Sequence, residues 1–212
     1  MSLIQLSSVS KTLKGTPVFE NLNATFEQGQ IYGIQGHNGS GKSVLFKMMC
    51  RFITPDTGTV TIDPRFLSPK QDYPSSFGVI IDRPGYLPSR TGIDNLRALA
   101  RIRDVIGDPE MQAAMIRVGL NPSTPQKVKN YSLGMKQKLA LAQAIMEDQQ
   151  VLILDEPFNG LDVDSVERVR DLLREFHEEG RTIIFTSHNV QDMEQLAQHR
   201  FRINRLQLEQ VA

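Results

Sequence analysis

The sequence predicts an α/β fold in which a helical segment interrupts a core of strands and helices. Three features predict it. A glycine-rich loop near residue 40 stands between a short apolar strand and a helix. Apolar residues recur with a helical period over residues 84–150, and a fully apolar strand then opens the last part of the chain. We therefore expect the core to comprise residues 1–83 and 151–212, with a helical subdomain inserted over 84–150.

The composition is that of an ordinary globular protein. The 212 residues are 40% apolar and 23% charged, and 24 basic residues balance 24 acidic ones. Because the net charge is zero, nothing attracts nucleic acid in bulk, and we expect no nucleic-acid partner. The first residues do not resemble a secretory signal, and no apolar run approaches the roughly 20 residues that span a bilayer. A cytoplasmic location is therefore expected, with any membrane-spanning part supplied by another chain.

The sequence of the first part of the core, residues 1–83, predicts short strands around one helix. Residues 22–26 alternate apolar and polar side chains, which is typical of a half-exposed strand. Ile31–Ile34 is a candidate buried strand, and a helix is expected from about Lys42 to Arg51. The turn sequence Pro55–Gly58 precedes another expected strand over Thr59–Ile62.

The helical segment carries capping signals. Thr91, Asp108 and Ser132 are each expected to cap a helix, and Gly119 is expected to end the second one. The apolar stripes of these helices consist of Ile93, Leu96, Leu99 and Ile102; of Met111, Met115 and Val118; and of Leu139, Ala142, Ile145 and Met146. We interpret the methionines as core residues.

The strand-and-helix rhythm returns after residue 150. Val151–Leu154 is apolar throughout, as in a parallel strand covered on both faces. Asp164–Glu167 matches a capping box, and Gly180 is expected to end the helix that it opens. Thr182–Thr186 is the next expected buried strand. The stripe of the helix consists of Val166, Val169, Leu172, Leu173 and Phe176.

The glycine-rich loop matches the pattern of a phosphate-binding loop between a strand and a helix. Its glycines let backbone N–H groups face a phosphate, and the helix N-terminus adds positive charge. Lys42 is expected to reach the β- and γ-phosphates of a nucleotide, and the Ser43 hydroxyl to bind Mg²⁺. The expected nucleotide-binding residues of the loop are Gly36, His37, Asn38, Gly39, Ser40, Gly41, Lys42, Ser43 and Val44.

Two acidic residues follow the apolar strand directly. Carboxylates at the end of a parallel strand lie beside the ligand in open α/β sheets, so Asp155 is expected to hold Mg²⁺. Glu156 is then placed to polarise the attacking water, and His188, after the next strand, to contact phosphate. Alone, the acidic pair would be an ordinary solvated turn and the histidine structural. The phosphate-binding loop favours the functional interpretation.

Two further motifs resemble those of one family. Tyr131–Gln137 reads YSLGMKQ at the start of a predicted helix, and Pro157–Asp162 reads PFNGLD after the acidic pair. With the phosphate loop, the DE strand and the histidine, they stand in the order of the ATP-binding-cassette (ABC) proteins. The YSLGM form is similar to that of bacterial exporters of drugs, peptide antibiotics and polysaccharides. The resemblance covers nearly the whole chain.

The resemblance implies a P-loop NTPase core with an N-terminal antiparallel β region and an inserted helical subdomain. It implies an ATPase that acts as a head-to-tail dimer, with two Mg-ATP between two nucleotide-binding subunits. Ser132 and Gly134 of one subunit would contact the γ-phosphate held by Lys42 of the other, and Asp162 would lie beside the nucleotide. Integral membrane subunits would carry the transport path and hold this chain on the inner face of the membrane.

Two positions depart from the family pattern. Leu13 stands where an aromatic residue usually stacks on adenine, so we expect loose adenine binding, unless Phe19 moves in to stack. Asp82 stands where many members carry glutamine and is expected to bind Mg²⁺ through water. The following segment, Pro84–Tyr86, would form part of a groove for a helix of the membrane partner.

Two other functions remain possible from the sequence. A soluble cassette ATPase of DNA repair or translation is one, although the chain has no long coiled-coil insertion, second cassette or basic arm. A cassette that binds ATP without hydrolysing it is the other, and intact Glu156, His188 and Ser132 argue against it. No residue identifies a transported substrate, and the direction of transport rests on the YSLGM form alone.

Overall fold

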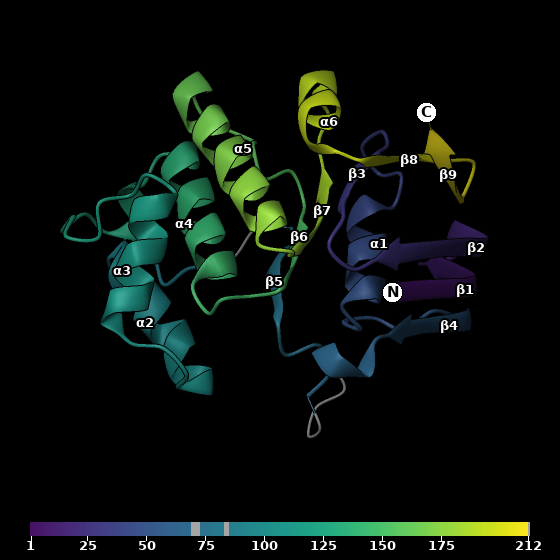
Figure 1. Cartoon of the computed structure of the whole chain (residues 1–212), viewed down its shortest axis with the longest axis horizontal. Coiled ribbons are helices and arrows are strands. Elements are labelled where there is room, and N and C mark those ends of the chain that lie inside the picture. Colours follow the sequence, from purple (N-terminus) through teal and green to yellow (C-terminus); the bar gives the residue numbers. More distant parts are fainter. Residues whose placement is uncertain (69–72, 83–84, 212) are drawn as a thin grey trace.

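The structure is a computed structural model of the chain and describes residues 1–68, 73–82 and 85–211. Pro84, which was expected to line a groove, lies outside the described residues. Two sheets and a group of helices make up the molecule. Figure 1 shows the helices α2, α3 and α4 gathered at one end, and an antiparallel sheet, with both termini nearby, at the other.

A six-stranded sheet forms the centre of the fold. Its order is β5-β6-β7-β3-β8-β9, and all neighbours are parallel except the last pair. β6, β7 and β3 are buried almost throughout, as their apolar sequences predict. The strands are β5 (Phe77–Ile80), β6 (Val151–Leu154), β7 (Thr182–Thr186), β3 (Ile31–Gln35), β8 (His199–Asn204) and β9 (Gln207–Val211).

The antiparallel sheet has the order β2-β1-β4. Its strands are β1 (Ser2–Leu13), β2 (Thr16–Glu27) and β4 (Thr57–Ile62). The expectation of short strands in the first thirty residues is wrong, because β1 and β2 are each 12 residues long. Bulges interrupt their pairing register, so the alternation of apolar and polar residues along β1 and β2 is broken and hides their length.

Helix α1 (Lys42–Met49) joins the two sheets. It lies between β3 and the antiparallel sheet in Figure 1. Its buried side chains Leu45 and Phe46 belong to one apolar cluster with Phe19 and Phe26 of β2 and with Ile34 of β3. This packing holds the start of α1 at the carboxyl ends of the strands of the central sheet.

The helices α2 (Gly92–Arg103), α3 (Asp108–Arg117) and α4 (Leu133–Ile145) follow, with short 3₁₀ helices η1 (Pro64–Phe66) and η2 (Val128–Asn130) before and between them. Two predicted caps are confirmed. The Thr91 side chain accepts a hydrogen bond from the backbone N–H of Asp94, and Ser132 accepts one from Met135. The buried stripe of α3 and its end at Gly119, with φ 77°, are also as predicted.

Two predictions for these helices are wrong. Gly107, not Asp108, is the N-cap of α3, because the Asp108 carboxylate is bound by Arg97, with Nε 2.9 Å from Oδ1. Glu110 instead accepts a hydrogen bond from the Gly107 N–H. Ile102, expected in the apolar stripe of α2, is 77% exposed, because it lies at an open hollow between β5, α2 and α4 and not against the core.

Helix α5 (Val163–Glu178) and helix α6 (Val190–Leu196) complete the fold. The expected capping box at Asp164 is wrong. Asp162 is the N-cap and accepts a hydrogen bond from the backbone N–H of Ser165, which places Asp164 in the first turn. The predicted apolar stripe is confirmed, with Val169, Leu172, Leu173 and Phe176 buried and Val166 partly buried.

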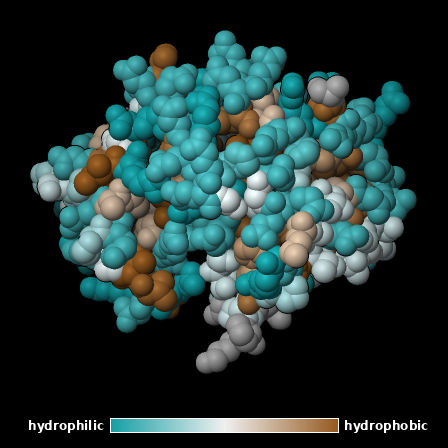
Figure 2. Space-filling view, viewed as in Figure 1, coloured by the Kyte–Doolittle hydropathy of each residue, from teal (hydrophilic) through white to brown (hydrophobic). Residues whose placement is uncertain are grey.

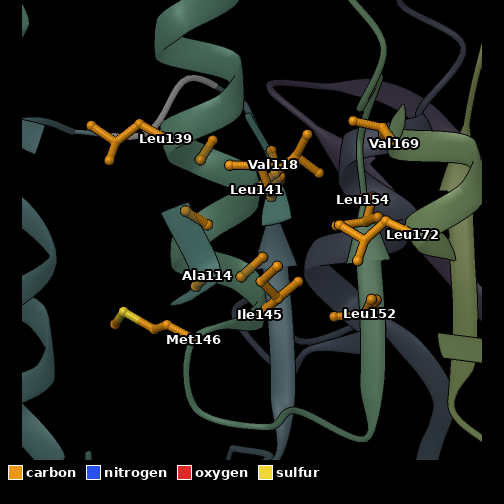
Figure 3. Packing of buried hydrophobic residues seen from close by; sticks show 14 of the residues in the cluster. Ala114, Val118, Leu139, Leu141, Ile145, Met146, Leu152, Leu154, Val169 and Leu172 are labelled. Atoms are coloured by element: carbon orange, nitrogen blue, oxygen red, sulfur yellow. The ribbon is translucent and has the colours of Figure 1, made fainter. Parts of the chain in front are cut away.

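One apolar cluster joins the inserted helices to the central sheet. Figure 3 shows Ala114 of α3, its C-cap residue Val118, and Leu139, Leu141 and Ile145 of α4, beside Leu152 and Leu154 of β6 and Val169 and Leu172 of α5. Because cores are close-packed, a displacement of α4 must be accommodated by the strand β6 and its neighbours. The start of α4 and the end of β6 are therefore mechanically linked.

The contact between β5 and α4 generates a stability prediction. A Cβ atom at Gly78 would overlap the carbonyl oxygen of Ala144, which is backbone and cannot move aside. We expect Gly78→Ala to destabilise the protein by about 2–3 kcal/mol through overpacking. Urea unfolding measures this, with Gly85→Ala as the control because a Cβ there meets nothing within 4 Å. Equal unfolding midpoints for the two variants would contradict the predicted contact.

Candidate functional site

The loop between β3 and α1 is shaped by its glycines. Gly41 has φ 104°, and a Cβ there would lie 2.6 Å from Cγ1 of Val18. Both the backbone conformation and the lack of space therefore exclude a side chain at position 41. The loop ends in the N-terminus of α1, which has no acidic residue in its first turn. Its free N–H groups and dipole favour an anion at this position.

Lys42 and Ser40 lie against the same loop. Lys42 is 8% exposed, and its Nζ donates to the carbonyl oxygens of Gly36 at 2.8 Å and His37 at 3.3 Å. The Ser40 hydroxyl is buried and has no hydrogen-bond partner among the described residues. A buried hydroxyl without a partner is costly unless a ligand satisfies it. The loop, the lysine and the hydroxyl together fit the oxygens of a phosphate chain.

Asp155 connects three elements at the carboxyl edge of the sheet. Its Oδ2 accepts a hydrogen bond from the Ser43 hydroxyl at 2.6 Å, and its Oδ1 accepts one from the Thr186 hydroxyl at 2.7 Å. A hydroxyl and a carboxylate beside a phosphate loop are hard oxygen donors of the kind that Mg²⁺ prefers. Because they provide few ligands, phosphate oxygens and water would have to complete the coordination of the metal.

Glu156 is held in an unusual backbone conformation. Its φ is 50°, in the left-handed region that non-glycine residues seldom adopt, and its N–H donates to the Thr186 hydroxyl at 2.8 Å. Thr186 therefore holds both acidic residues. Sequence reasoning did not single it out, although a hydroxyl at the end of a buried strand beside β6 is a usable signal.

The Glu156 side chain faces His188. Oε1 of Glu156 lies 3.1 Å from Nε2 of His188, without the geometry of a hydrogen bond. Burial raises the pKa of the Glu156 carboxyl and nearby Asp155 adds to this, whereas His188 and Lys42 oppose it without cancelling it. A carboxylate with a raised pKa accepts a proton from water more readily than an ordinary one.

These side chains open into one hollow of about 400 Å³. It draws on the end of β1, the start of β2, the glycine-rich loop, the end of β6 and the segment after β7. The lining residues are Leu13, Val18, Asn38, Gly39, Gly41, Lys42, Ser43, Val44, Asp155, Glu156 and His188. Gly36 and His37 line a neighbouring hollow of about 380 Å³, which also contains His188. The structure therefore brings most of the expected site residues together.

Four expected site residues lie elsewhere. Ser132 and Gly134 are at the start of α4, beside the loop that leads to Asp162, since a Cβ on Gly134 would lie 2.8 Å from the Gly160 carbonyl oxygen. Asp162 caps α5 with its side chain. Asp82 is 55% exposed and pairs with Lys47 of α1, with Nζ 2.5 Å from Oδ2. None of the four lines the hollow of the phosphate loop.

The family whose profile matches residues 19–159 is described as ABC transporter. An uncharacterized ABC transporter ATP-binding protein of Bacillus subtilis, YybJ, is 38% identical over 98% of this chain and 95% of its own length. The bacitracin transport ATP-binding protein BcrA of Enterococcus faecalis is 36% identical over 92% of this chain, which spans only 64% of BcrA.

A solved structure has the same fold. It is the dimeric post-hydrolysis state of the ATP-binding cassette MJ0796, bound to ADP and Pi, with a TM-score of 0.86. The alignment covers 99% of both chains at 20% sequence identity. At 20% identity, this similarity shows a shared fold and nothing more.

The lining of the hollow generates a prediction about base binding. Leu13 is 40% exposed at the hollow, whereas Phe19 is 1% exposed in the core, where it packs against Gly41 and cannot stack on a base without leaving the core. An aromatic ring adds about 1–3 kcal/mol of stacking per base. We therefore expect Leu13→Tyr to lower the ATP dissociation constant by about fivefold to 150-fold, and Leu13→Ile to leave it unchanged.

Titration of ATP and GTP against each variant measures the effect. The wild type should discriminate weakly between the two, because the phosphate contacts do not distinguish the bases. A wild-type preference for ATP of more than about tenfold, or roughly 1.4 kcal/mol, together with no gain from tyrosine, would contradict loose adenine binding.

Proposed function

The chain belongs to the ABC transporter family, and on this premise we propose that it binds and hydrolyses ATP to power export through separate membrane subunits. The observation that carries the proposal is the convergence of Lys42, the Ser43–Asp155 pair and Glu156 on one hollow. This set provides for both binding and hydrolysis, so a cassette that only binds ATP is not favoured. A soluble, non-transport cassette is not favoured either, since BcrA is named as a transport protein.

The residues that line the hollow have different roles in binding and hydrolysis. The loop N–H groups and Lys42 bind the phosphate chain. Ser43 and Asp155 would hold Mg²⁺, which would neutralise phosphate charge. Glu156 orients the attacking water and accepts its proton. His188, 3.1 Å from Glu156, is placed to contact the γ-phosphate.

A second copy of the chain completes each site. Ser132, Gly134 and Asp162 do not line the hollow of their own chain, yet Ser132 begins α4 and is exposed. The N-terminus of α4 carries free N–H groups and a positive dipole end, which suit the γ-phosphate held by a facing subunit. We propose a head-to-tail homodimer in which Asp162 lies beside the partner's nucleotide. The MJ0796 cassette, which has the same fold, is dimeric in its post-hydrolysis state, and this supports the assembly of two copies.

The docking site that we propose for the membrane subunit is a second hollow, of about 480 Å³, between β5, α2 and α4. Its rim exposes apolar side chains, with Phe52 at 56%, Tyr73 at 49% and Ile102 at 77%. Figure 2 shows a mostly hydrophilic face with an apolar patch over the end of α2. Such a hollow fits a short amphipathic helix on the inner side of the membrane.

No helix among residues 1–68, 73–82 and 85–211 has the length and apolar character to cross a bilayer. We propose that the membrane partner holds the chain at the inner face of the membrane. Asp82 is connected to this docking hollow through its ion pair with Lys47, which lines the hollow. We propose that Asp82 couples docking to the nucleotide site and reaches Mg²⁺ only through water, when the pair with Lys47 opens.

The role of Glu156 is tested by Glu156→Gln. The amide has the shape of the carboxylate but cannot accept a proton, so hydrolysis should fall at least a hundredfold, the lower end of general-base effects, about 10²–10⁴-fold. ATP affinity should stay within about twofold, and a nucleotide-bound dimer should accumulate in size-exclusion chromatography with Mg-ATP. Glu178→Gln, on the exposed end of α5, is the control. Turnover at the wild-type rate in Glu156→Gln would refute the assignment.

Asp82→Ala tests the coupling. It removes an exposed ion pair, and such pairs stabilise a protein by about 0–1 kcal/mol at most, so the fold and the ATP dissociation constant should change little. Transport by the complex with the copurified membrane subunit should fall several-fold. Asp171→Ala, which breaks the exposed pair with Arg174, is the matched control and should leave transport unchanged. Loss of ATP affinity with unchanged transport in Asp82→Ala would show that the assignment is wrong.

A further inference from the structure

One side chain connects the start of α4 to the catalytic loop. Gln137 lies on the second turn of α4, and its Nε2 is 3.3 Å from the Glu156 carbonyl oxygen and 3.0 Å from the Pro157 carbonyl oxygen. A single amide therefore donates to two consecutive carbonyl groups that are 19 and 20 residues away in sequence. These bonds hold the backbone of Glu156 rather than its carboxylate.

The backbone of Glu156 needs such support. A non-glycine residue at φ 50° is strained, and it persists only where the surroundings fix it. Thr186 fixes the N–H side of Glu156, at 2.8 Å, and Gln137 fixes the carbonyl side. Asn159 also donates its N–H to the Glu156 carbonyl oxygen, at 3.2 Å, but it belongs to the same loop and moves with it. Gln137 ties the loop to a different element.

The neighbouring residue extends the connection. The Tyr86 hydroxyl donates to the Lys136 carbonyl oxygen at 2.7 Å, so the segment after Asp82 is bonded to the same turn of α4. Tyr86, Asp82 and Gln137 line one hollow of about 430 Å³. The turn at 136–137 thus contacts the segment near the proposed docking hollow on one side and the catalytic loop on the other.

We propose that Gln137 is a positioning residue that holds Glu156 in its left-handed conformation and makes the position of the carboxylate depend on α4. The inference rests on the proposed function. In a head-to-tail dimer the start of α4 faces the γ-phosphate of the second site, so a shift of α4 caused by that phosphate moves the Glu156 of the first. Gln137 therefore couples the two sites within one chain.

Two substitutions at Gln137 test the proposal in the full chain. Gln137→Met keeps an unbranched side chain of similar length but has no donor, and Gln137→Lys keeps a donor. Loss of the hydrogen bonds should lower kcat for Mg-ATP about tenfold in Gln137→Met, with KM within twofold. Gln137→Lys should recover most of kcat. Gln112→Met, at an exposed position of α3, is the control and should keep the wild-type kcat.

Amide hydrogen exchange gives a readout that does not depend on activity. In Gln137→Met, exchange at residues 156–161 should quicken about fivefold to tenfold, whereas exchange in β6 should not change. Unchanged kcat and exchange would overturn the proposal. So would a fall in kcat matched by Gln112→Met, or a rise in KM that accounts for the loss. If the wild type hydrolyses no ATP, the proposed function fails, and the exchange data alone decide whether Gln137 positions the loop.

Discussion

Asp155 accepts hydrogen bonds from two hydroxyls that lie far apart in the sequence, Ser43 at 2.6 Å and Thr186 at 2.7 Å. Both bonds lie at the carboxyl edge of the central sheet, where β3, β6 and β7 end in neighbouring positions. The sheet order thereby brings the phosphate loop, the acidic pair and His188 into one hollow. Every function proposed for this chain depends on that alignment, because binding and hydrolysis need the same few side chains within contact distance.

The inserted helices influence this edge through packing. The apolar cluster of Figure 3 joins α3 and α4 to β6 and α5, and Gly78 lets β5 lie against α4. Because close-packed cores transmit displacements, α4 can act on the end of β6 without touching the nucleotide of its own subunit. The bonds of Gln137 to the Glu156 and Pro157 carbonyls are the polar counterpart of this packing. An ATPase with this arrangement converts a change at one phosphate into a movement of a helix.

In the proposed dimer, the residues of each nucleotide site come from two copies of the chain, which favours dimer formation. One chain supplies the phosphate loop and the catalytic carboxylate, while Ser132 and Gly134 stand outside the hollow that these residues line. A helix N-terminus has unsatisfied N–H groups, and a bound phosphate on a facing subunit would satisfy them. The γ-phosphate would then belong to both copies, which explains in physical terms why its loss could release them.

The sequence by itself determined the features that depend on neighbouring residues. The glycine-rich loop, the buried strand Val151–Leu154 and the caps at Thr91 and Ser132 were predicted correctly, because backbone conformation, periodicity and capping act within a few residues. The family motifs, in their order along the chain, then indicated which residues form the nucleotide site. Only the tertiary structure decided the length of β1 and β2, the exposure of Ile102, the N-caps at Gly107 and Asp162, the pairing of Asp82 with Lys47, and the contacts of Thr186 and Gln137. Most of these depend on residues far apart in the chain, and no local pattern specifies which hydroxyl, amide or ammonium group folding will bring to a given carboxylate or carbonyl.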